Sequence, residues 1–457
     1  MPFVGREKEL QRLKRFYESD REKLAVLYGR RRVGKSELLR ASLCDGELPF
    51  VFLQCRATSL QSNACDLMAL AETGFGMPDL EVSDFESALK AVFAIMKGRR
   101  GVLVLDEYPC LRELLPGCDS LIQLLVDDNR DAGLKLVLCG SRLDVMTGML
   151  ASKSPLYGRA GLQLRLEPMD YFDSARFYPT FSDEDKVRLY AVFGGIPFYN
   201  ARIDEALSVR ENIIRLIAGR DAVFADEVLF LLRTEISKTS NAERVFEAMA
   251  NGAGKFSEIL GRSAFSSSPA LADILNRLVG MELVRKESPI NDEKNKKKTV
   301  YRFGDNLIEF YYRFVFKHRS RLMYLPAEQV FDACMAEEFE TDIVPKAFEG
   351  IVRQFLIREN LSGGIEPPFF RIGSYSLPDG SGGPAVATED DDGFVSCECS
   401  FGDRPMTEAE VLQAMERAKA SGLPVECFRF FARAGFDCAA GKPGCRFFTL
   451  ADLYRRA

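Results

Sequence analysis

The chain has 457 residues, of which 47% are hydrophobic and 28% charged, a balance typical of a globular protein with several domains. Its net charge of −6 gives no overall attraction to nucleic acid, so any such contact must come from a local patch. No apolar run is long enough to span a bilayer, and the N-terminus lacks the basic-then-apolar order of a signal peptide. The 12 cysteines form no C-x-x-C pair, which favours free thiols in a reducing compartment. We therefore predict a cytoplasmic protein that does not enter membranes.

Residues 1–168 alternate between strand-like and helix-like segments. This alternation predicts an α/β fold with an open parallel sheet covered by helices on both faces. Ligands of such sheets bind where the carboxyl ends of the strands meet. The expected strands are Leu24–Tyr28, Phe50–Leu53, Val102–Leu105, Leu134–Cys139 and Leu162–Leu166.

The first of these strands leads directly into Gly29–Ser36, with the sequence GRRRVGKS. This octapeptide fits the phosphate-binding pattern G-x-x-x-x-G-K-[ST], and a helix-like run follows it. We expect the backbone of Gly29, Arg30, Arg31, Arg32, Val33 and Gly34 to surround the phosphates. Lys35 would contact the β- and γ-phosphates of ATP, and Ser36 would bind Mg²⁺. A chance match in a glycine-rich turn is the alternative, and the flanking strand and helix argue against it.

A second motif, Gly101–Glu107 (GVLVLDE), is an apolar run that ends in two carboxylates. A strand that is apolar on both faces suits the centre of a parallel sheet. Asp106 would then hold Mg²⁺ through water, and Glu107 would accept a proton from the attacking water. The alternative is a buried strand whose acidic end only meets solvent. Together with the phosphate loop, the motif predicts ATP hydrolysis.

The next strand ends at Ser141, which we expect at the same edge of the sheet. Its hydroxyl could contact the γ-phosphate of ATP, or it could cap the following helix. Both interpretations remain open from the sequence.

Three further regions follow the sheet. Residues 169–238 are helix-like, and a Gly-Gly-Ile-Pro segment ending at Pro197 separates two helices, so we predict a helical lid. Residues 239–304 contain three short amphipathic helices and a β-hairpin, the order of a winged helix. Residues 305–457 predict a small α/β domain.

The hairpin loop, Asn291–Lys298, contains four lysines. They could contact the phosphates of duplex DNA, although a solvated loop tip is the commoner explanation for such a run. The aromatic segment Asn306–Phe316 has helical spacing and is expected in a core rather than against stacked bases.

These motifs together resemble the archaeal-type AAA/STAND ATPases. The similar segments are Phe3–Glu7, Gly29–Ser36, Leu103–Glu107, Cys139–Ser141, Ser154–Arg159 and Gly194–Pro197. The resemblance implies that Val4, Gly5 and Arg6 lie against the nucleotide base and that Pro197 lies at the lid. It also implies that Arg159 is a charge sensor or arginine finger, acting in its own chain or across the interface of a homo-oligomer.

The C-terminal domain of one branch of this family is similar to restriction-endonuclease-like folds. Such sites combine an acidic residue on a helix, an aspartate, and Glu-x-Lys on a strand. Glu349 and Glu398 match two of these parts. The aspartate position falls at Ala385, and the lysine position is Ser400, so we predict an inactive nuclease-like domain.

Two functions follow as hypotheses. The first is a slow ATPase with Mg²⁺ as its cofactor, which acts as a conformational switch coupled to DNA or to a protein partner. The alternative is an ATP-regulated DNA-binding protein of the transcription-regulator type with little turnover. A nuclease needs the two missing residues, and a scaffold that recruits a protein through its C-terminal domain is the fourth interpretation.

Overall fold

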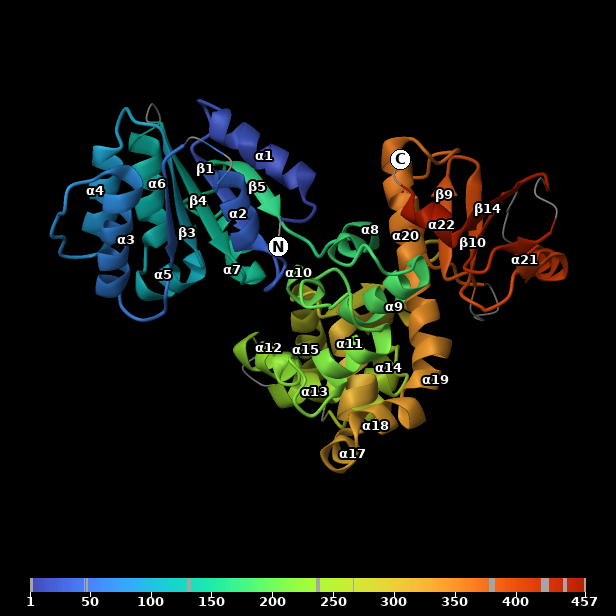
Figure 1. Ribbon diagram of the computed structural model, residues 1–457. Coiled ribbons are helices and arrows are strands. Elements are labelled where there is room, and N and C mark those ends of the chain that lie inside the picture. The colour runs from blue at the N-terminus through green and yellow to red at the C-terminus, as the bar shows by residue number, and fades with distance from the viewer. Residues whose placement is uncertain are drawn as a thin grey trace. The chain divides into compact units, whose positions relative to one another are not determined.

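The computed structural model describes residues 3–44, 46, 48–129, 133–235, 239–265, 267–377, 383–420, 427–438 and 442–455 (Figure 1). The chain divides into two compact units, one up to Pro168 and one from Met169 onward. Within the described residues, no helix is both long and apolar enough to cross a membrane.

The first unit is built on a five-stranded parallel sheet in the order β2-β3-β4-β1-β5. The strands are β1 (Leu24–Tyr28), β2 (Phe50–Gln54), β3 (Gly101–Asp106), β4 (Leu134–Gly140) and β5 (Ala160–Arg165). All residues of β3 and β4 are buried, as their continuous apolar sequences predict. The five predicted strands are therefore confirmed.

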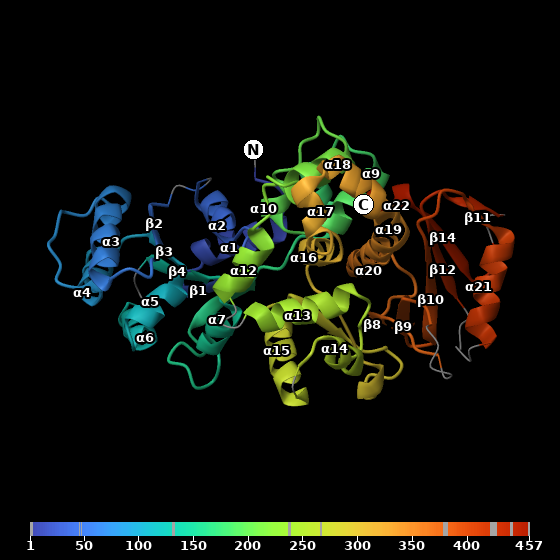
Figure 2. The same ribbon diagram turned by 90° about the horizontal axis from the view of Figure 1, so that it is seen from below.

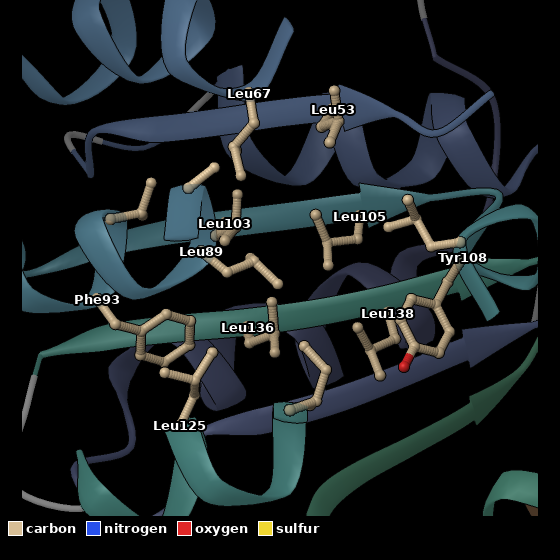
Figure 3. Close-up of a cluster of buried hydrophobic side chains, with 14 of the residues drawn as sticks. Leu53, Leu67, Leu89, Phe93, Leu103, Leu105, Tyr108, Leu125, Leu136 and Leu138 are labelled. Atoms are coloured by element: carbon tan, nitrogen blue, oxygen red, sulfur yellow. The ribbon is translucent and has the colours of Figure 1, made fainter. Parts of the chain in front are cut away.

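Helices cover both faces of this sheet (Figure 1). They are α1 (Glu7–Glu18), α2 (Lys35–Cys44), α3 (Leu60–Phe75), α4 (Phe85–Ile95), α5 (Tyr108–Leu114), α6 (Cys118–Asp128) and α7 (Leu143–Met149). Figure 3 shows leucines of β2, β3 and β4 packed against Leu67 of α3, Leu89 and Phe93 of α4, and Leu125 of α6. Burial of these side chains holds the strands in the register that aligns their carboxyl ends.

The second unit begins with short helices, as predicted for the region after residue 168. They are α8 (Tyr171–Ser174), α9 (Asp183–Phe193), α10 (Pro197–Asn200), α11 (Val209–Ile213) and α12 (Glu227–Glu235), with a 3₁₀ turn at Ala175–Phe177 and a π-helical turn at Ile214–Ala218. Gly194, with φ 55°, ends α9, and Pro197 is the first residue of α10. A side chain at Gly195 would collide with the Met169 carbonyl oxygen, since a Cβ there would lie 1.8 Å from it. The end of the predicted lid, residues 236–238, lies outside the described residues.

Three helices and an antiparallel hairpin follow in the predicted order. They are α13 (Thr239–Ala250), α14 (Phe256–Arg262), α15 (Ser268–Gly280), β6 (Val284–Glu287) and β7 (Val300–Phe303). The hairpin loop contains a short 3₁₀ helix, Lys296–Lys298. This is the element order that the winged-helix interpretation requires.

The aromatic segment forms α16 (Asn306–Phe310) and a π-helical turn, Tyr311–Phe316. Phe310, Tyr311, Tyr312 and Phe314 are buried, which confirms the expected core role. The chain continues through α17 (Arg319–Tyr324), α18 (Ala327–Cys334), α19 (Ala336–Glu338), a π-helical turn (Phe339–Ile343) and the long α20 (Val344–Ser362).

The C-terminal part contains a mixed sheet in the order β14-β12-β10-β9-β8. Its elements are β8 (Arg371–Gly373), β9 (Val386–Asp390), β10 (Gly393–Ser400), α21 (Glu408–Ala420), β12 (Phe428–Ala432), β14 (Cys445–Thr449) and α22 (Leu450–Tyr454), with a small second sheet of β11 (Met406–Thr407) and β13 (Phe436–Asp437). Phe355 of α20 packs on Phe431 and Phe448, whereas α21 packs on Phe428 and Phe430. Because side chains alternate along a strand, the two helices cover opposite faces.

Candidate nucleotide and magnesium site

The phosphate loop joins β1 to α2 in an unusual backbone conformation. Arg32 has a φ of 67° and Gly34 a φ of 90°, and alternation of left- and right-handed residues turns successive N–H groups toward one point. Gly29 is needed for a different reason, because a Cβ there would lie 2.2 Å from the carbonyl oxygen of Leu166. The loop is therefore an anion cradle fixed against the segment that follows β5.

Lys35 is the first residue of α2 and is buried. Its ammonium donates to the carbonyl oxygens of Gly29 and Arg30, each at 2.9 Å. The lysine thus lies over the mouth of the loop, beside the N-terminus of a helix whose partial positive charge also favours anions. The oxygens of a phosphate bound in the loop could take over the contacts that the Lys35 ammonium makes with these two carbonyl oxygens.

Ser36 and Asp106 meet as the two motifs predict. The Ser36 hydroxyl donates to Oδ2 of Asp106 at 2.6 Å, although the two residues are 70 positions apart. The buried carboxylate accepts this hydrogen bond, so the lone pairs of Ser36 Oγ remain available to a cation. Hydroxyl and carboxylate oxygens are the type of ligand that Mg²⁺ prefers. This pair fits Mg²⁺, with Ser36 as a direct ligand and Asp106 beside it.

Glu107 follows at the N-terminal end of α5, in a left-handed conformation with φ 52°. Its Oε2 accepts a hydrogen bond from Ser141 Oγ at 3.0 Å. The following helix, α7, has Arg142 as its N-cap and no side-chain cap. Ser141 is therefore a partner of the acidic residue at the sheet edge, and the helix-cap alternative is wrong.

The N-terminal segment is tied to the phosphate loop through Arg6. This buried arginine donates to the carbonyl oxygen of Val33 at 3.4 Å and to that of Glu167. Gly5 and Arg6 both have positive φ, 69° and 67°, which turns the chain into α1. The contact of Val4, Gly5 and Arg6 with a nucleotide base stays a prediction, as does that of Pro197, which belongs to the second unit.

Arg159 lies at the opposite edge of the sheet from the phosphate loop. It precedes Ala160, which pairs with Leu24 at the start of β1, whereas the loop follows Tyr28 at the end of that strand. At about 3.3 Å per residue, the ends of β1 are roughly 13 Å apart. The guanidinium is also directed to Asp127, with Nη2–Oδ2 at 2.8 Å. This placement argues against action on the nucleotide of its own chain.

Two residues that the motifs did not include lie beside these groups. Gln54, the last residue of β2, pairs in register with Asp106 and so ends at the same edge. Its position after an apolar strand was a signal that sequence reasoning missed. Asp127, the partner of Arg159, belongs to an ordinary helix sequence and carried no signal.

The cysteines are free thiols that differ in burial, and Cys44 and Cys65 are exposed. Cys55, Cys118, Cys139 and Cys397 are buried and free. Burial raises the pKa of the Cys139 thiol well above its usual value, and the nearby Asp106 carboxylate adds to this effect. Among the described residues, no group of three or more His, Cys, Asp or Glu side chains could hold a metal ion. Magnesium at Ser36 would accordingly depend on the nucleotide phosphates for further ligands.

In the C-terminal sheet, the aspartate and lysine positions of the nuclease pattern are occupied by Ala385 and Ser400. Cys397 pairs with Val386, so continuation of this antiparallel register puts Ala385 opposite Glu398. An aspartate would be needed there, and Ser400 ends the strand in place of lysine. Glu398 lines a cavity of about 300 Å³ together with Arg417 and Gln413.

Comparisons with known proteins agree with this site. Residues 3–202 match a family described as an ATPase domain predominantly from Archaea, and residues 311–412 match one described as archaeal and bacterial proteins of unknown function. Residues 3–202 are thus similar to archaeal-type ATPase domains, and residues 311–412 are similar to the second family.

Individual relatives are similar over most of the chain. An uncharacterised protein of Methanocaldococcus jannaschii is 29% identical over 378 residues, which cover 82% of this chain and 81% of that protein. The solved Walker-type ATPase of Pyrococcus abyssi has a TM-score of 0.52 at 19% identity, covering 68% of this chain and 96% of its own, and shows the same fold. The ORC2 protein of Aeropyrum pernix gives a TM-score of 0.42 at 15% identity, covering 74% and 96%.

Proposed function

We propose that the protein hydrolyses Mg-ATP and uses the cycle as a conformational switch. The observation that carries the proposal is the 2.6 Å contact between Ser36 and Asp106, with Lys35 over the phosphate loop and Glu107 next to Asp106. Anion cradle, cation ligands and a carboxylate base are the groups that phosphoryl transfer to water requires.

Each residue has a separate role in this proposal. Lys35 and the loop N–H groups bind and orient the phosphates, and Ser36 with Asp106 holds Mg²⁺, which neutralises charge on the phosphate oxygens when bound. Glu107 orients the attacking water and accepts its proton, while Ser141 positions the Glu107 carboxylate. Because one hydroxyl holds this base, we expect turnover to be slow until the contact rearranges.

The direct test is phosphate release from Mg-ATP by wild type and Glu107→Gln. The variant keeps the shape of the side chain but cannot accept the proton, so turnover should fall about 10²–10⁴-fold while ATP affinity is retained. Glu86→Gln, on the outer surface of α4, is the matched control. Turnover by Glu107→Gln at the wild-type rate would remove Glu107 as the base.

Arg159 extends the proposal to an oligomer. Its place at the far edge of the sheet and its partial exposure suit a finger that reaches the nucleotide of a second copy. The specific activity of wild type should then rise with protein concentration. Arg159→Ala should lower the specific activity reached at high protein concentration and leave ATP affinity unchanged. If the specific activity of wild type and variant did not depend on protein concentration, this role would be contradicted.

Duplex DNA is the second candidate partner, supported by charge on the hairpin. Lys294, Lys296 and Lys297 are exposed at its tip, and Arg285 and Lys286 are exposed on β6. These cations could contact backbone phosphates, so binding should weaken steeply with salt. We would measure binding to a short duplex at low and moderate salt with Lys294, Lys296 and Lys297 changed to Gln. If the protein did not bind the duplex even at low salt, a protein rather than DNA would be the expected partner.

A further inference from the structure

The β6–β7 hairpin packs on the C-terminal sheet through its loop. The Ile290 amide donates to the Ser374 carbonyl oxygen at 2.9 Å. Asn291 and Ser376 bond reciprocally, with the Asn291 amide donating at 2.8 Å and accepting at 3.0 Å. Gly373 gives Ile290 its space, because a Cβ there would lie 2.6 Å from the isoleucine. In Figure 2, β8 and β9 lie next to α14, one of the helices that precede the hairpin.

Arg371 of β8 adds an ionic contact to the same loop. Its guanidinium contacts Glu293 of the hairpin loop at 2.6 Å and Glu389 of β9 at 2.7 Å. One cation thus joins an acidic side chain of each partner. The lysines of the loop follow Glu293 directly in the sequence, so this contact also positions them.

The strands of the hairpin face the helix that precedes the sheet. Glu287 of β6 contacts Arg353 of α20 at 3.5 Å and Arg302 of β7 at 3.1 Å. Arg353 also donates to the backbone carbonyl of Ala385. A single arginine therefore links α20, the hairpin and the chain just before β9.

Glu349 precedes Arg353 by one helical turn on α20. Burial raises the pKa of Glu349, Glu398 adds to this effect, and Arg302, Arg353 and Lys346 oppose it. The two arginines that contact Glu287 thus also act on the Glu349 carboxylate.

We propose that this edge of the C-terminal domain is an intramolecular docking site for the hairpin, in which Arg353 joins α20, β6 and the chain just before β9. A fixed guanidinium can serve several acceptors at once, which suits it to join three chain segments. The docking site sets the position of the lysine loop, so the loop and the C-terminal domain move together. The inference concerns the second unit alone and does not depend on ATP hydrolysis.

Hydrogen exchange of the full-length protein tests the docking site. In Arg353→Ala, the β6 and β7 amides should exchange roughly tenfold faster than in wild type, because the contacts of Arg353 with Glu287 and Ala385 no longer oppose opening of the hairpin. Arg358→Ala is the matched control, since this arginine lies on the same helix but stacks on Phe172 at 3.5 Å. Equal protection of the hairpin in all three proteins would overturn the proposal.

A second variant separates docking from a general loss of stability. Glu287→Gln keeps the size of the side chain and leaves α20 unchanged, and it should also loosen the hairpin. The two effects should be less than additive in the double variant, because both changes break the Glu287–Arg353 contact, although Glu287→Gln also weakens the contact with Arg302. Fully additive acceleration of hydrogen exchange would mean that Glu287 and Arg353 act separately, which would contradict the proposed docking contact.

Discussion

The protein has two sheet edges with acidic residues, and they have different partners. At the end of β3, Asp106 accepts a hydrogen bond from Ser36, a group that can bind a cation. Just before β9, Ala385 lies opposite Glu398 of β10, and Arg353 donates to that alanine's carbonyl oxygen. The acidic residue of the first edge thus has a possible cation ligand as its partner, whereas the second edge is bonded to an arginine of the protein itself.

Lys35→Ala should produce the largest change at the first edge. The variant loses a buried ammonium that contacts phosphate, which corresponds to about 1.5–3 kcal/mol, or roughly 10–150-fold in the dissociation constant of ATP. Calorimetric titration measures it, with Lys90→Ala on the exposed face of α4 as the control. If ATP bound both variants equally, the phosphate loop would not be the binding site.

Ser36→Ala should act on the metal more than on the nucleotide. Loss of one Mg²⁺ ligand should raise the Mg²⁺ concentration for half-maximal phosphate release about 5–30-fold, a loss of about 1–2 kcal/mol. Ser42→Ala lies on the same helix, but its hydroxyl bonds to Tyr17 at 2.9 Å and contacts no cation ligand. An unchanged Mg²⁺ requirement in Ser36→Ala would contradict the comparison between the two edges.

Ser141→Ala should have a smaller effect, because it removes one hydrogen bond to Glu107. Such a bond contributes about 1 kcal/mol, so turnover should fall about fivefold through poorer orientation of the base. ATP affinity should stay the same, which separates this variant from Lys35→Ala. A drop in affinity with normal turnover would instead favour direct contact of Ser141 with the γ-phosphate.

The second edge should show no nuclease activity. Wild type should leave supercoiled plasmid intact with Mg²⁺ or Mn²⁺, with or without ATP, because the aspartate and lysine positions hold Ala385 and Ser400. Gel electrophoresis measures this, with a commercial restriction enzyme as the positive control. Nicking that disappears in Glu398→Gln would contradict the prediction and make the two edges functionally alike.

The sequence predicted most of what depends on neighbours along the chain. Positive φ at Gly34, the buried strand before Asp106 and the helix break before Pro197 all follow from local residue types. The strands of the first unit were predicted to within a few residues for the same reason. In the C-terminal part, the acidic run Glu389–Gly393 indicates an exposed turn, yet Glu389 and Asp390 belong to β9. The sequence also predicts a turn at residues 380–384 and a strand at residues 425–432, of which residues 380–382 and 425–426 lie outside the described residues.

Contacts between distant residues were decided by the tertiary structure. From the sequence, Ser141 could either cap the next helix or contact the γ-phosphate. Only the packing of β4 beside β3 showed that its hydroxyl lies 3.0 Å from Glu107. Arg159 belongs to a motif of the family, yet the parallel register assigns it to the edge away from the phosphate loop. Arg353 had no motif, because its partners Glu287 and Ala385 come from other elements. Residue types and local spacing determine which chemistry a chain can support, whereas the fold decides which charges meet, since only packing brings remote segments within reach of a hydrogen bond.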